Sequence, residues 1–467
     1  MAKKKILLLA DDLRIHSGIG TMSKEFVMGT LHKYDWVQMA GAIEHPEIGK
    51  ITDMSEECNK AHGTTDAYLK IYPVNGYGDQ RTLRQVINIE KPDAIMHFTD
   101  PRFWGWLYSM EHEIRQSIPI MYYNIWDDLP FPHWNENAYE SCDGLMAISK
   151  QTYNINKHVC KRKPRVEGKD LFYVPHGINE QLFKPIDKTS EEYVKLTDNI
   201  FNGRQYDYTM LFNSRNIRRK GISNILVAYA MMTEDLSQEQ RDKIALILHT
   251  DPVDNNGTDL PAVASTVCPK RNVIFSNQKM PADALNILYN AADVVLQPSS
   301  AEGFGLSHME AMMTATPTIA TVIGGLQDQM GFKVDGKDVT TANFTEEVPS
   351  NSTGKMSKVY GEWVYPLWPN LSLEGSPPTP YIYDSRPTIP DISKGMTYWY
   401  NMKKEEREEK GMAGRNWAIK NGYTQKGMCL AMINGIDTTL STFKPRASYQ
   451  LIDTGAPKPV YKSGVLL

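Results

Sequence analysis

Short apolar runs alternate along the chain with stretches in which apolar positions recur every three or four residues. The runs predict buried strands, and the amphipathic stretches predict helices. In the first part we expect strands at residues 5–10, 36–43, 68–74, 93–98, 118–124, 144–148 and 171–174, with helices at 82–90 and 104–115. In the second part we expect strands at 208–213, 243–249, 273–276, 294–296 and 317–320, with helices at 222–232 and 282–291. Continuous apolar runs followed by helices are typical of parallel strands that are covered on both faces.

This alternation occurs twice, and the polar stretch 179–205 separates the two runs. The sequence therefore predicts an α/β protein with two doubly wound, Rossmann-like domains that face a cleft, where the strands' carboxyl ends bind ligands. We expect the first domain to span residues 1–178 and the second 179–430. Residues 331–390, which are rich in Pro, Ser, Thr and Gly, predict an irregular insertion in the second domain. For 431–467 we expect a helix and tail that pack back toward the first domain.

Composition and charge place the chain among globular proteins. Its 467 residues are 41% apolar and 23% charged, and the net charge of −4 gives no general attraction to nucleic acid or acidic lipid. The five cysteines show no CxxC spacing, which favours a reducing compartment and disfavours structural zinc. No run approaches the roughly 18 apolar residues of a membrane span. The first run, 6–10, is too short for a signal peptide. We therefore expect a cytoplasmic protein without a membrane span.

The first strand runs into a glycine-containing loop, LLLADDLRIHSGIGT, and a helical pattern begins near Thr21. Gly18 and Gly20 would allow backbone amides at this helix start to approach a phosphate. The complete GxGxxG pattern is absent, because Ser23 occupies the position of the third glycine. A plain tight turn would produce the same residues.

A basic segment, NSRNIRRKGI, follows the first strand of the second part. Arg215 and Lys220 would face the cleft at the carboxyl end of that strand. Fixed positive charge at this place would stabilise a diphosphate leaving group, on which charge develops during transfer. A basic surface loop ahead of a helix is the alternative interpretation.

Two glutamates stand eight residues apart in PSSAEGFGLSHMEAMM. Glu302 lies in a glycine-containing loop, and we expect Glu310 in the first turn of the following helix. Gly303 and Gly305 would let the backbone pass close to a ligand, with amide groups directed out of the helix N-terminus. Glu310 could instead only complement the helix dipole. Paired carboxylates of this kind also occur in glycosidases.

Several motifs in matched order resemble one family. EGFGLSHME is similar to the E-x7-E motif of retaining glycosyltransferases with the GT-B fold, particularly glycosyltransferase family 4. SRNIRRKG resembles that family's Arg…Lys diphosphate clamp, and VPHGINEQLF resembles its interdomain segment. The similarity extends through LYNAADVVLQPSS and EAMMTATPTIAT. Together these motifs cover roughly residues 5–21 and 90–325.

The resemblance implies transfer of a hexosyl or pentosyl group, with retention, from a nucleoside diphosphate sugar to an acceptor hydroxyl. It favours a UDP-sugar as donor and implies no essential metal or other cofactor. Arg215 and Lys220 would hold the diphosphate, Glu310 the ribose hydroxyls and Glu302 the hydroxyls of the donor sugar. The donor-binding residues implied in this way are Gly18, Gly20, Arg215, Lys220, Phe304, Gly305, Leu306 and Glu310.

The chain departs from the family pattern at two places. In DAIMHFTDP, Thr99 stands where many members carry a histidine of the catalytic site, whereas Asp100 keeps the acidic position after it. His97 could share a face with Thr99 by strand alternation, although a strand histidine can also be a core residue. The candidate catalytic residues are therefore Glu302, Asp100 and His97. Ala315 replaces a glycine that is usual in the helix-to-strand turn, which should alter only packing.

The acceptor is left open by the sequence: a glycan, a lipid, a small molecule or a hydroxymethylated base in DNA would each fit. His176 and the loop aromatics Trp104 and Trp126 are candidates for acceptor binding. The basic stretch from Lys157 to Lys169 could bind DNA, or it could be a solvated loop.

Other functions agree less well with the residues. A glycosidase would leave the Arg215 and Lys220 pair and the second α/β domain without a role. A zinc deaminase based on His308 and Glu310 fails because no P-C-x-x-C follows. The absence of D-x-D disfavours the metal-dependent, single-sheet type of glycosyltransferase. A catalytically inactive GT-B protein that binds a sugar or nucleotide remains the alternative.

Overall fold

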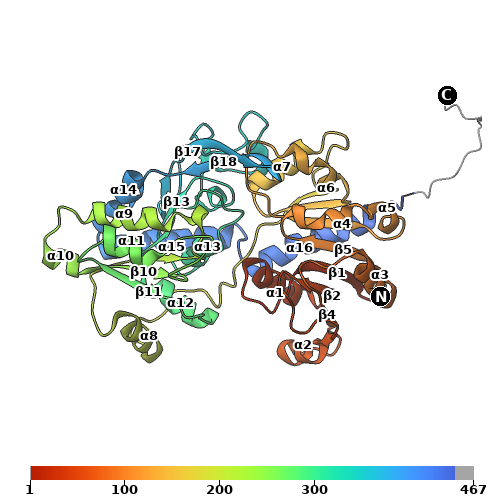
Figure 1. Ribbon diagram of the computed structural model, residues 1–467, viewed down its shortest axis with the longest axis horizontal. Coiled ribbons are helices and arrows are strands. Elements are labelled where there is room, and N and C mark those ends of the chain that lie inside the picture. Colours follow the sequence, from red (N-terminus) through yellow and green to blue (C-terminus); the bar gives the residue numbers. More distant parts are fainter. Residues whose placement is uncertain (1, 447–467) are drawn as a thin grey trace, which may run out of the picture.

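The computed structural model describes residues 2–446 and arranges them in two lobes, each built around a sheet (Figure 1). One sheet contains eight strands from residues 4–173, and the other contains six strands from residues 208–367. Helices cover both sheets, so the structure confirms the prediction of a doubly wound α/β protein with two sheets. The part of the C-terminal tail beyond residue 446 lies outside the described residues.

The first sheet has the strand order β3-β4-β2-β1-β5-β6-β7-β8, parallel except for the pairing of β3 with β4. The strands are β1 Lys4–Asp11, β2 Tyr34–Gly41, β3 Thr52–Asp53, β4 Leu69–Pro73, β5 Ala94–Phe98, β6 Ile120–Asn124, β7 Gly144–Ala147 and β8 Leu171–Tyr173. The helices are α1 Gly18–Thr30, α2 Ser55–His62, α3 Gln80–Glu90, α4 Gly105–Tyr108, α5 Glu111–Ile114, α6 Glu136–Glu140 and α7 Lys150–Val159.

Strand β1 shows why the apolar runs form buried parallel strands. Ile6 and Leu8 belong to one hydrophobic core, whereas Leu7 and Leu9 belong to another on the opposite face of the sheet. Because successive side chains point to opposite faces, a strand covered by helices on both sides must be apolar at every position. The same rule explains the other predicted strands. The helix expected at 104–115 is instead divided into short turns, because the chain bends at Ser109 and Met110.

The second sheet has the strand order β11-β10-β9-β12-β13-β16, and all its pairs are parallel. The strands are β9 Tyr208–Asn213, β10 Ile244–His249, β11 Asn272–Ser276, β12 Val294–Gln297, β13 Thr318–Thr321 and β16 Val364–Leu367. The helices are α8 Glu191–Phe201, α9 Ile222–Met232, α10 Gln238–Asp242, α11 Leu260–Val267, α12 Ala282–Ala291, α13 Leu306–Met313, α14 Ile389–Tyr400, α15 Lys404–Lys420 and α16 Gln425–Thr442.

The stretch 331–390 is more ordered than predicted, so its description as an irregular insertion is wrong in part. It contains β16, which completes the second sheet, and the hairpins β14 Lys333–Val334 with β15 Lys337–Asp338 and β17 Asn370–Ser376 with β18 Thr379–Arg386. A proline inside the run VYPL hid β16, but an edge strand tolerates a residue without an N–H donor. We call residues 344–386 the bridging segment, because its hairpin β17–β18 reaches toward α7 of the first lobe (Figure 1).

Helix α16 lies far in the sequence from the first sheet but packs against it. It contacts α1, β7 and β8, and a Cβ atom on Gly29 of α1 would collide with the Sγ atom of Cys429. Helix α15 remains on the second lobe beside α13 (Figure 1). The chain therefore crosses between the lobes a second time before α16. No helix within residues 2–446 is both long and apolar enough to cross a bilayer.

Candidate active site in the interdomain cleft

The predicted donor residues lie where strands of the second sheet end. Strand β9 leads into the turn η3 (Arg218–Lys220), and β12 leads through residues 298–305, which we call the donor loop, into α13. Carboxyl ends of parallel strands share one edge of the sheet, which brings the two segments together. The amide of Ser300 donates a hydrogen bond to the carbonyl of Arg219 at 2.7 Å.

Glu302 forms an ion pair with Lys220, and the side chains are only 13% and 8% exposed. Arg219 Nη1 lies 3.4 Å from the same carboxylate and donates to the carbonyl of Ala301 at 2.5 Å. Burial alone would raise the pKa of Glu302, but Lys220 and Arg219 reverse this and hold it below its ordinary value. Glu302 is therefore an anion held against cations, which is unsuitable for a general acid that must carry a proton.

The glycines around Glu302 are required by close packing. Gly305 precedes α13 with φ 91°, and a Cβ atom there would collide with Leu326. Gly324 has φ 42°, and a Cβ atom there would collide with the carbonyl oxygen of Glu302. The backbone of the donor loop is therefore held tightly against the turn at Gly324.

The amide groups ahead of α13 are available to a ligand. The N–H groups of Phe304, Gly305 and Leu306 donate no hydrogen bond within residues 2–446. Unpaired amides at a helix N-terminus form an anion-binding position, since the helix dipole also favours negative charge there. That these three residues bind the donor stays a prediction.

Glu310 lies in the second turn of α13, not in the first turn as predicted. Its carboxylate accepts a hydrogen bond from the hydroxyl of Tyr289 at 2.6 Å, and Tyr289 accepts one from Asn213 at the end of β9 at 2.8 Å. Burial raises the pKa of Glu310 to about 7, although the bond from Tyr289 opposes the shift. The two glutamates of the motif therefore occupy different environments and cannot share one proton-transfer task.

Arg215 does not join Lys220 in this structure. Its side chain is 61% exposed, and its Nε atom donates to Asp254 at 2.8 Å. Arg219, which the sequence analysis did not single out, lies beside Glu302 instead. The three consecutive basic residues of η3 made the sequence ambiguous, since only the turn geometry decides which of them faces the donor loop.

The glycine loop of the first domain approaches α13 from the other side of the cleft. Ser17 caps α1 and accepts a hydrogen bond from the amide of Gly20 at 2.9 Å. A Cβ atom on Gly18 would lie 3.6 Å from Leu306 Cδ1, whereas one on Gly20 would lie 2.7 Å from the carbonyl oxygen of Ile15. Gly18 therefore borders the start of α13, whereas at Gly20 the close backbone of the turn leaves no room for a side chain.

Asp100 lies at the carboxyl end of β5, where it caps the turn η1 (Pro101–Trp104). Its carboxylate accepts hydrogen bonds from the backbone amide and the guanidinium of Arg102, at distances from 2.5 to 2.9 Å for the shortest contacts. The preceding residue, Thr99, has φ 146°, a conformation that strains a β-branched residue. Strain at a strand end beside a cleft is consistent with a functional position.

His97 and Trp104 are core residues, so their predicted places in the site are wrong. His97 is fully buried and stacks on Tyr122 with ring centroids 4.2 Å apart, and burial lowers the pKa of His97 to about 3. Trp104 is 1% exposed and packs 5.5 Å from the His97 ring. Strand alternation correctly placed His97 on a face of the sheet, but α4 and η1 cover that face.

His176 and Trp126 are also buried, but both contact segments of the cleft. His176 Nδ1 lies 2.8 Å from the hydroxyl of Tyr123, and its ring packs 5.1 Å from that of Phe304 in the donor loop. Burial lowers the pKa of His176 to about 3, which keeps the ring neutral. Trp126 donates from Nε1 to the carbonyl of Asp128 at 3.0 Å. Both side chains thus support neighbouring loops and do not form an exposed acceptor surface.

Asp127 and Asp128 were missed by the sequence analysis. They lie in the loop after β6, beyond Ile125 and Trp126, and their carboxyl groups lie within the electrostatic influence of Arg219 across the cleft. The donor loop is close to the same segment, since a Cβ atom on Gly303 would lie 3.0 Å from the carbonyl oxygen of Ile125. The signal was present in the sequence, because two acidic residues lie in the loop after a predicted strand whose carboxyl end faces the cleft.

The basic stretch from Lys157 to Lys169 lies away from the donor loop. It connects the end of α7 to the start of β8, and in a parallel α/β sheet this edge is opposite the carboxyl ends of the strands. Arg162 pairs with Glu140 at 2.9 Å, and Arg165 is buried, where it donates to backbone carbonyls. Part of the positive charge proposed for DNA is therefore already used within the protein.

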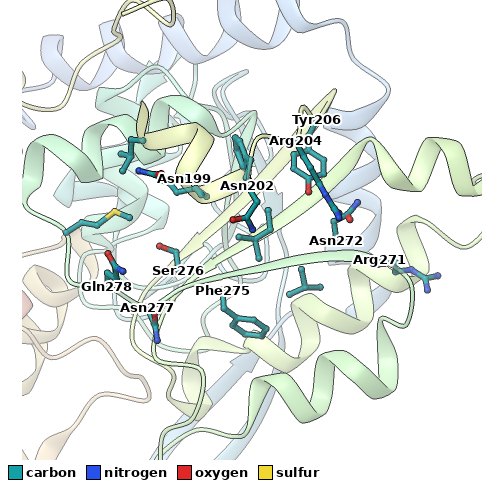
Figure 2. A pocket seen from close by; sticks show the side chains of 16 residues that line it. Asn199, Asn202, Arg204, Tyr206, Arg271, Asn272, Phe275, Ser276, Asn277 and Gln278 are labelled. Atoms are coloured by element: carbon teal, nitrogen blue, oxygen red, sulfur yellow. The ribbon is translucent and has the colours of Figure 1, made fainter. Parts of the chain in front are cut away.

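A hollow of about 630 Å³ lies between α8 and the edge strand β11, away from the donor loop. Figure 2 shows its polar lining, which includes Asn199, Asn202 and Asn272. None of the predicted site residues lines it. Its size alone therefore does not make it the site, because the charged groups and the free amides are gathered at the donor loop.

The fold and this cleft define a class of protein. A profile of the family described as Glycosyl transferases group 1 matches residues 198–340. The structure of Anabaena HepE, solved in complex with UDP and glucose, superposes with a TM-score of 0.62 at 13% identity, over 93% of this chain and 100% of that one. The chain therefore has the GT-B fold with two Rossmann-like domains, as the motifs implied.

Sequence relatives point to the same group. The chain is 43% identical over 84 residues to a D-inositol 3-phosphate glycosyltransferase of Corynebacterium urealyticum, which is 17% of this chain and 20% of that protein. It is 28% identical over 232 residues to an uncharacterised glycosyltransferase of Methanocaldococcus jannaschii, which is 49% of this chain and 53% of that protein. The chain thus spans at most about half the length of these relatives. The profile match and these relatives agree with the resemblance to GT-B glycosyltransferases that the motifs indicated.

Proposed function

We propose that this protein is a retaining glycosyltransferase that moves a hexosyl or pentosyl group from a nucleoside diphosphate sugar to an acceptor hydroxyl. The observation that carries the proposal is the buried contact of Lys220 with Glu302 beside the unpaired amides of Phe304, Gly305 and Leu306. This arrangement places fixed positive charge and free donors where a diphosphate would leave. A UDP-sugar is the preferred donor, which is supported by the complex of HepE with UDP and glucose.

The geometry suggests how the donor would enter. The diphosphate would take over Lys220 and Arg219 from Glu302, with further hydrogen bonds from the donor-loop amides. Glu302, freed from its cations, would then bind hydroxyls of the donor sugar. Glu310 would accept hydrogen bonds from the ribose hydroxyls in place of the bond from Tyr289. Arg215 could reach the diphosphate only by leaving Asp254, which its exposed position allows.

Catalysis on this proposal comes from positioning and from stabilisation of the leaving diphosphate by protein cations, without an essential metal. The neutral His176 and the buried His97 would not carry protons in the reaction. Retention is proposed from the family resemblance. It would be visible in the anomeric configuration of the product by NMR.

The test is to incubate the protein with a panel of UDP-, GDP- and ADP-sugars and to measure release of the nucleoside diphosphate with and without candidate acceptors. We expect release with a UDP-sugar that increases with the right acceptor and is unchanged by EDTA. Glu302→Ala should reduce transfer more than tenfold while the protein stays folded. Nucleotide binding without any diphosphate release would instead identify an inactive binding protein.

A further inference from the structure

A small cavity lies beside the donor loop, between the two lobes. Its volume is about 180 Å³, well below the roughly 300–1,000 Å³ that are typical of pockets for drug-sized ligands. Its walls come from the loop after β6, from Ser300 and Ala301 of the donor loop, and from the bridging segment, including residues 347–355. We call this cavity the interdomain chamber.

The bridging segment encloses the chamber by docking on the first domain. The amide of Tyr383 in β18 donates to the carbonyl of Leu129 at 2.7 Å. The ring of Tyr381 packs edge-on against Trp134, with centroids 4.4 Å apart. Backbone pairing and an aromatic contact together hold the hairpin over the loop after β6. The chamber is therefore part of the folded structure, since its two sides are joined directly.

Asp127 and Asp128 present free carboxyl groups at the chamber wall. Their backbone carbonyls are fixed, because Gln151 Nε2 donates to that of Asp127 at 2.5 Å and Trp126 Nε1 to that of Asp128 at 3.0 Å. In contrast, neither carboxyl group accepts a hydrogen bond from another residue in the described part of the chain, residues 2–446. The loop is thus rigid while its acidic groups remain available to a ligand.

The acidic pair is adjacent to the predicted donor site. A Cβ atom on Gly324 would collide with the carbonyl oxygen of Glu302 and would lie 3.5 Å from Asp127 Cβ. Burial raises the pKa of Asp127 to about 6 and raises that of Asp128 as well. A carboxyl group whose pKa is raised is protonated part of the time, and in that form it both donates and accepts hydrogen bonds. Hydroxyl groups are the partners that match this capacity.

We propose that the interdomain chamber binds the acceptor, and that Asp127 and Asp128 hold the hydroxyls of a small, neutral polyol or sugar. This proposal rests on the proposed function and names the substrate class of the same cleft. Asp127 and Asp128 are binding and positioning residues here. They orient the acceptor hydroxyl toward the sugar held at Glu302.

The charges around the chamber select against a phosphorylated acceptor. The guanidinium of Arg102 is occupied by Asp100, and Arg219 is occupied by Glu302 and a backbone carbonyl. Lys355 is the one cation among the described lining residues, and it is exposed at the rim. A phosphate group in the buried part of the chamber would thus lie beside Asp127 and Asp128 without a cation next to it, which costs electrostatic free energy.

The test measures binding, so it does not depend on turnover. Myo-inositol, glucose and galactose, and a monophosphate of each, are titrated into the full-length protein with and without UDP, using saturation-transfer NMR and calorimetry. We expect at least one neutral compound to bind at least tenfold more tightly than its monophosphate. The variant Asp127→Asn/Asp128→Asn should weaken that binding at least tenfold. Glu374→Gln, on the exposed face of β17, is the matched control and should change it less than twofold.

Three results would overturn the proposal: tighter binding of the monophosphates, no binding of any neutral compound, or equal binding by the Asp127→Asn/Asp128→Asn variant. A melting temperature within a few degrees of the wild-type value would show that the variant is folded. UDP binding in the same titrations tests the proposed function separately. Binding of the neutral compound through Asp127 and Asp128 without binding of UDP would support the acceptor role of the chamber and contradict the proposed donor site.

Discussion

The two sides of the cleft balance their charges in different ways. On the second domain, Lys220 is paired with Glu302, and Arg215 with Asp254. On the first domain, Asp127 and Asp128 form no ion pair with any residue of the described range 2–446, and burial shifts their pKa values upward instead. Lys220 and Glu302 stay ionised without a ligand because they neutralise each other, and Lys220 can exchange the Glu302 carboxylate for a diphosphate. The carboxyl groups of Asp127 and Asp128 can instead bind the hydroxyls of a neutral ligand, which need no counter-ion.

The largest effect is expected from removing the Lys220–Glu302 ion pair on the second domain. Lys220→Ala should reduce transfer about hundredfold, because a fixed cation at the leaving group is lost. It should also lower the free energy of unfolding by about 3 kcal/mol, because Glu302 stays buried without its partner. Steady-state rates and urea denaturation measure the two effects.

The control for that variant is Lys60→Ala, which removes an exposed ion pair with Glu56. It should change stability by less than about 0.5 kcal/mol and leave transfer intact. Near-normal turnover of Lys220→Ala would show that Lys220 does not bind the donor diphosphate.

The next effect concerns the rigidity of the donor loop. Gly324→Ala should reduce transfer about tenfold and cost about 2 kcal/mol or more, because the new methyl group displaces the Glu302 backbone and the positive φ is strained. Gly336→Ala is the matched control, since Gly336 has φ 75° but open space around its Cβ position. It should show only the strain, about 1 kcal/mol, with normal activity. Equal effects of the two variants would mean that the loop is free to move.

A pH series distinguishes Glu310 from Glu302. Because burial raises the pKa of Glu310 to about 7, the folded protein keeps a proton that the unfolded chain releases near pH 4.5. The contribution of Glu310 to stability should therefore decrease from about pH 4.5 to pH 7. The free energy of unfolding of Glu310→Gln, relative to that of the wild type, should rise by about 2 kcal/mol from pH 5 to pH 8. Urea denaturation measures this difference. Nucleotide binding by the variant should weaken. A constant difference between the two proteins across this range would contradict the raised pKa.

The smallest effect is expected at Ala315, far from both charged groups. Ala315 has φ 59° in the turn between α13 and β13. Ala315→Gly should stabilise the protein by about 1 kcal/mol, since glycine adopts this conformation without strain, and transfer should be unchanged. Thermal melting measures the gain. A lower melting temperature would show that the methyl group contributes packing that outweighs the strain.

Much of the fold could be predicted because parallel sheets with two covered faces require continuous apolar strands. The runs that contain β1, β5 and β12 were therefore recognised directly. Strand β16 was not, because its short run with an internal proline differs little from a loop. In the site, the order of motifs singled out Glu302 and Lys220, and the structure brings these two side chains into contact.

Other site residues could not be chosen from the sequence. Arg215 and Arg219 are both basic residues of one short segment, and only the turn η3 decides which one faces Glu302. His97 follows the correct alternation of β5, but the covering helices bury it. The bridging segment contacts the loop after β6 across about 250 residues, as in the bond from Tyr381 to Phe131. Such contacts leave no local pattern.

The sequence by itself determined the two sheets, their parallel strands and the position of the donor loop. It did so because strand burial and glycine turns depend on neighbouring residues. Only the tertiary structure decided which charges are paired, which aromatic rings are buried and what encloses the cleft. These depend on groups from distant segments that meet at the edges of two sheets. The chamber at Asp127 and Asp128 is one example, because residues of the bridging segment more than 200 positions later in the chain form its other walls.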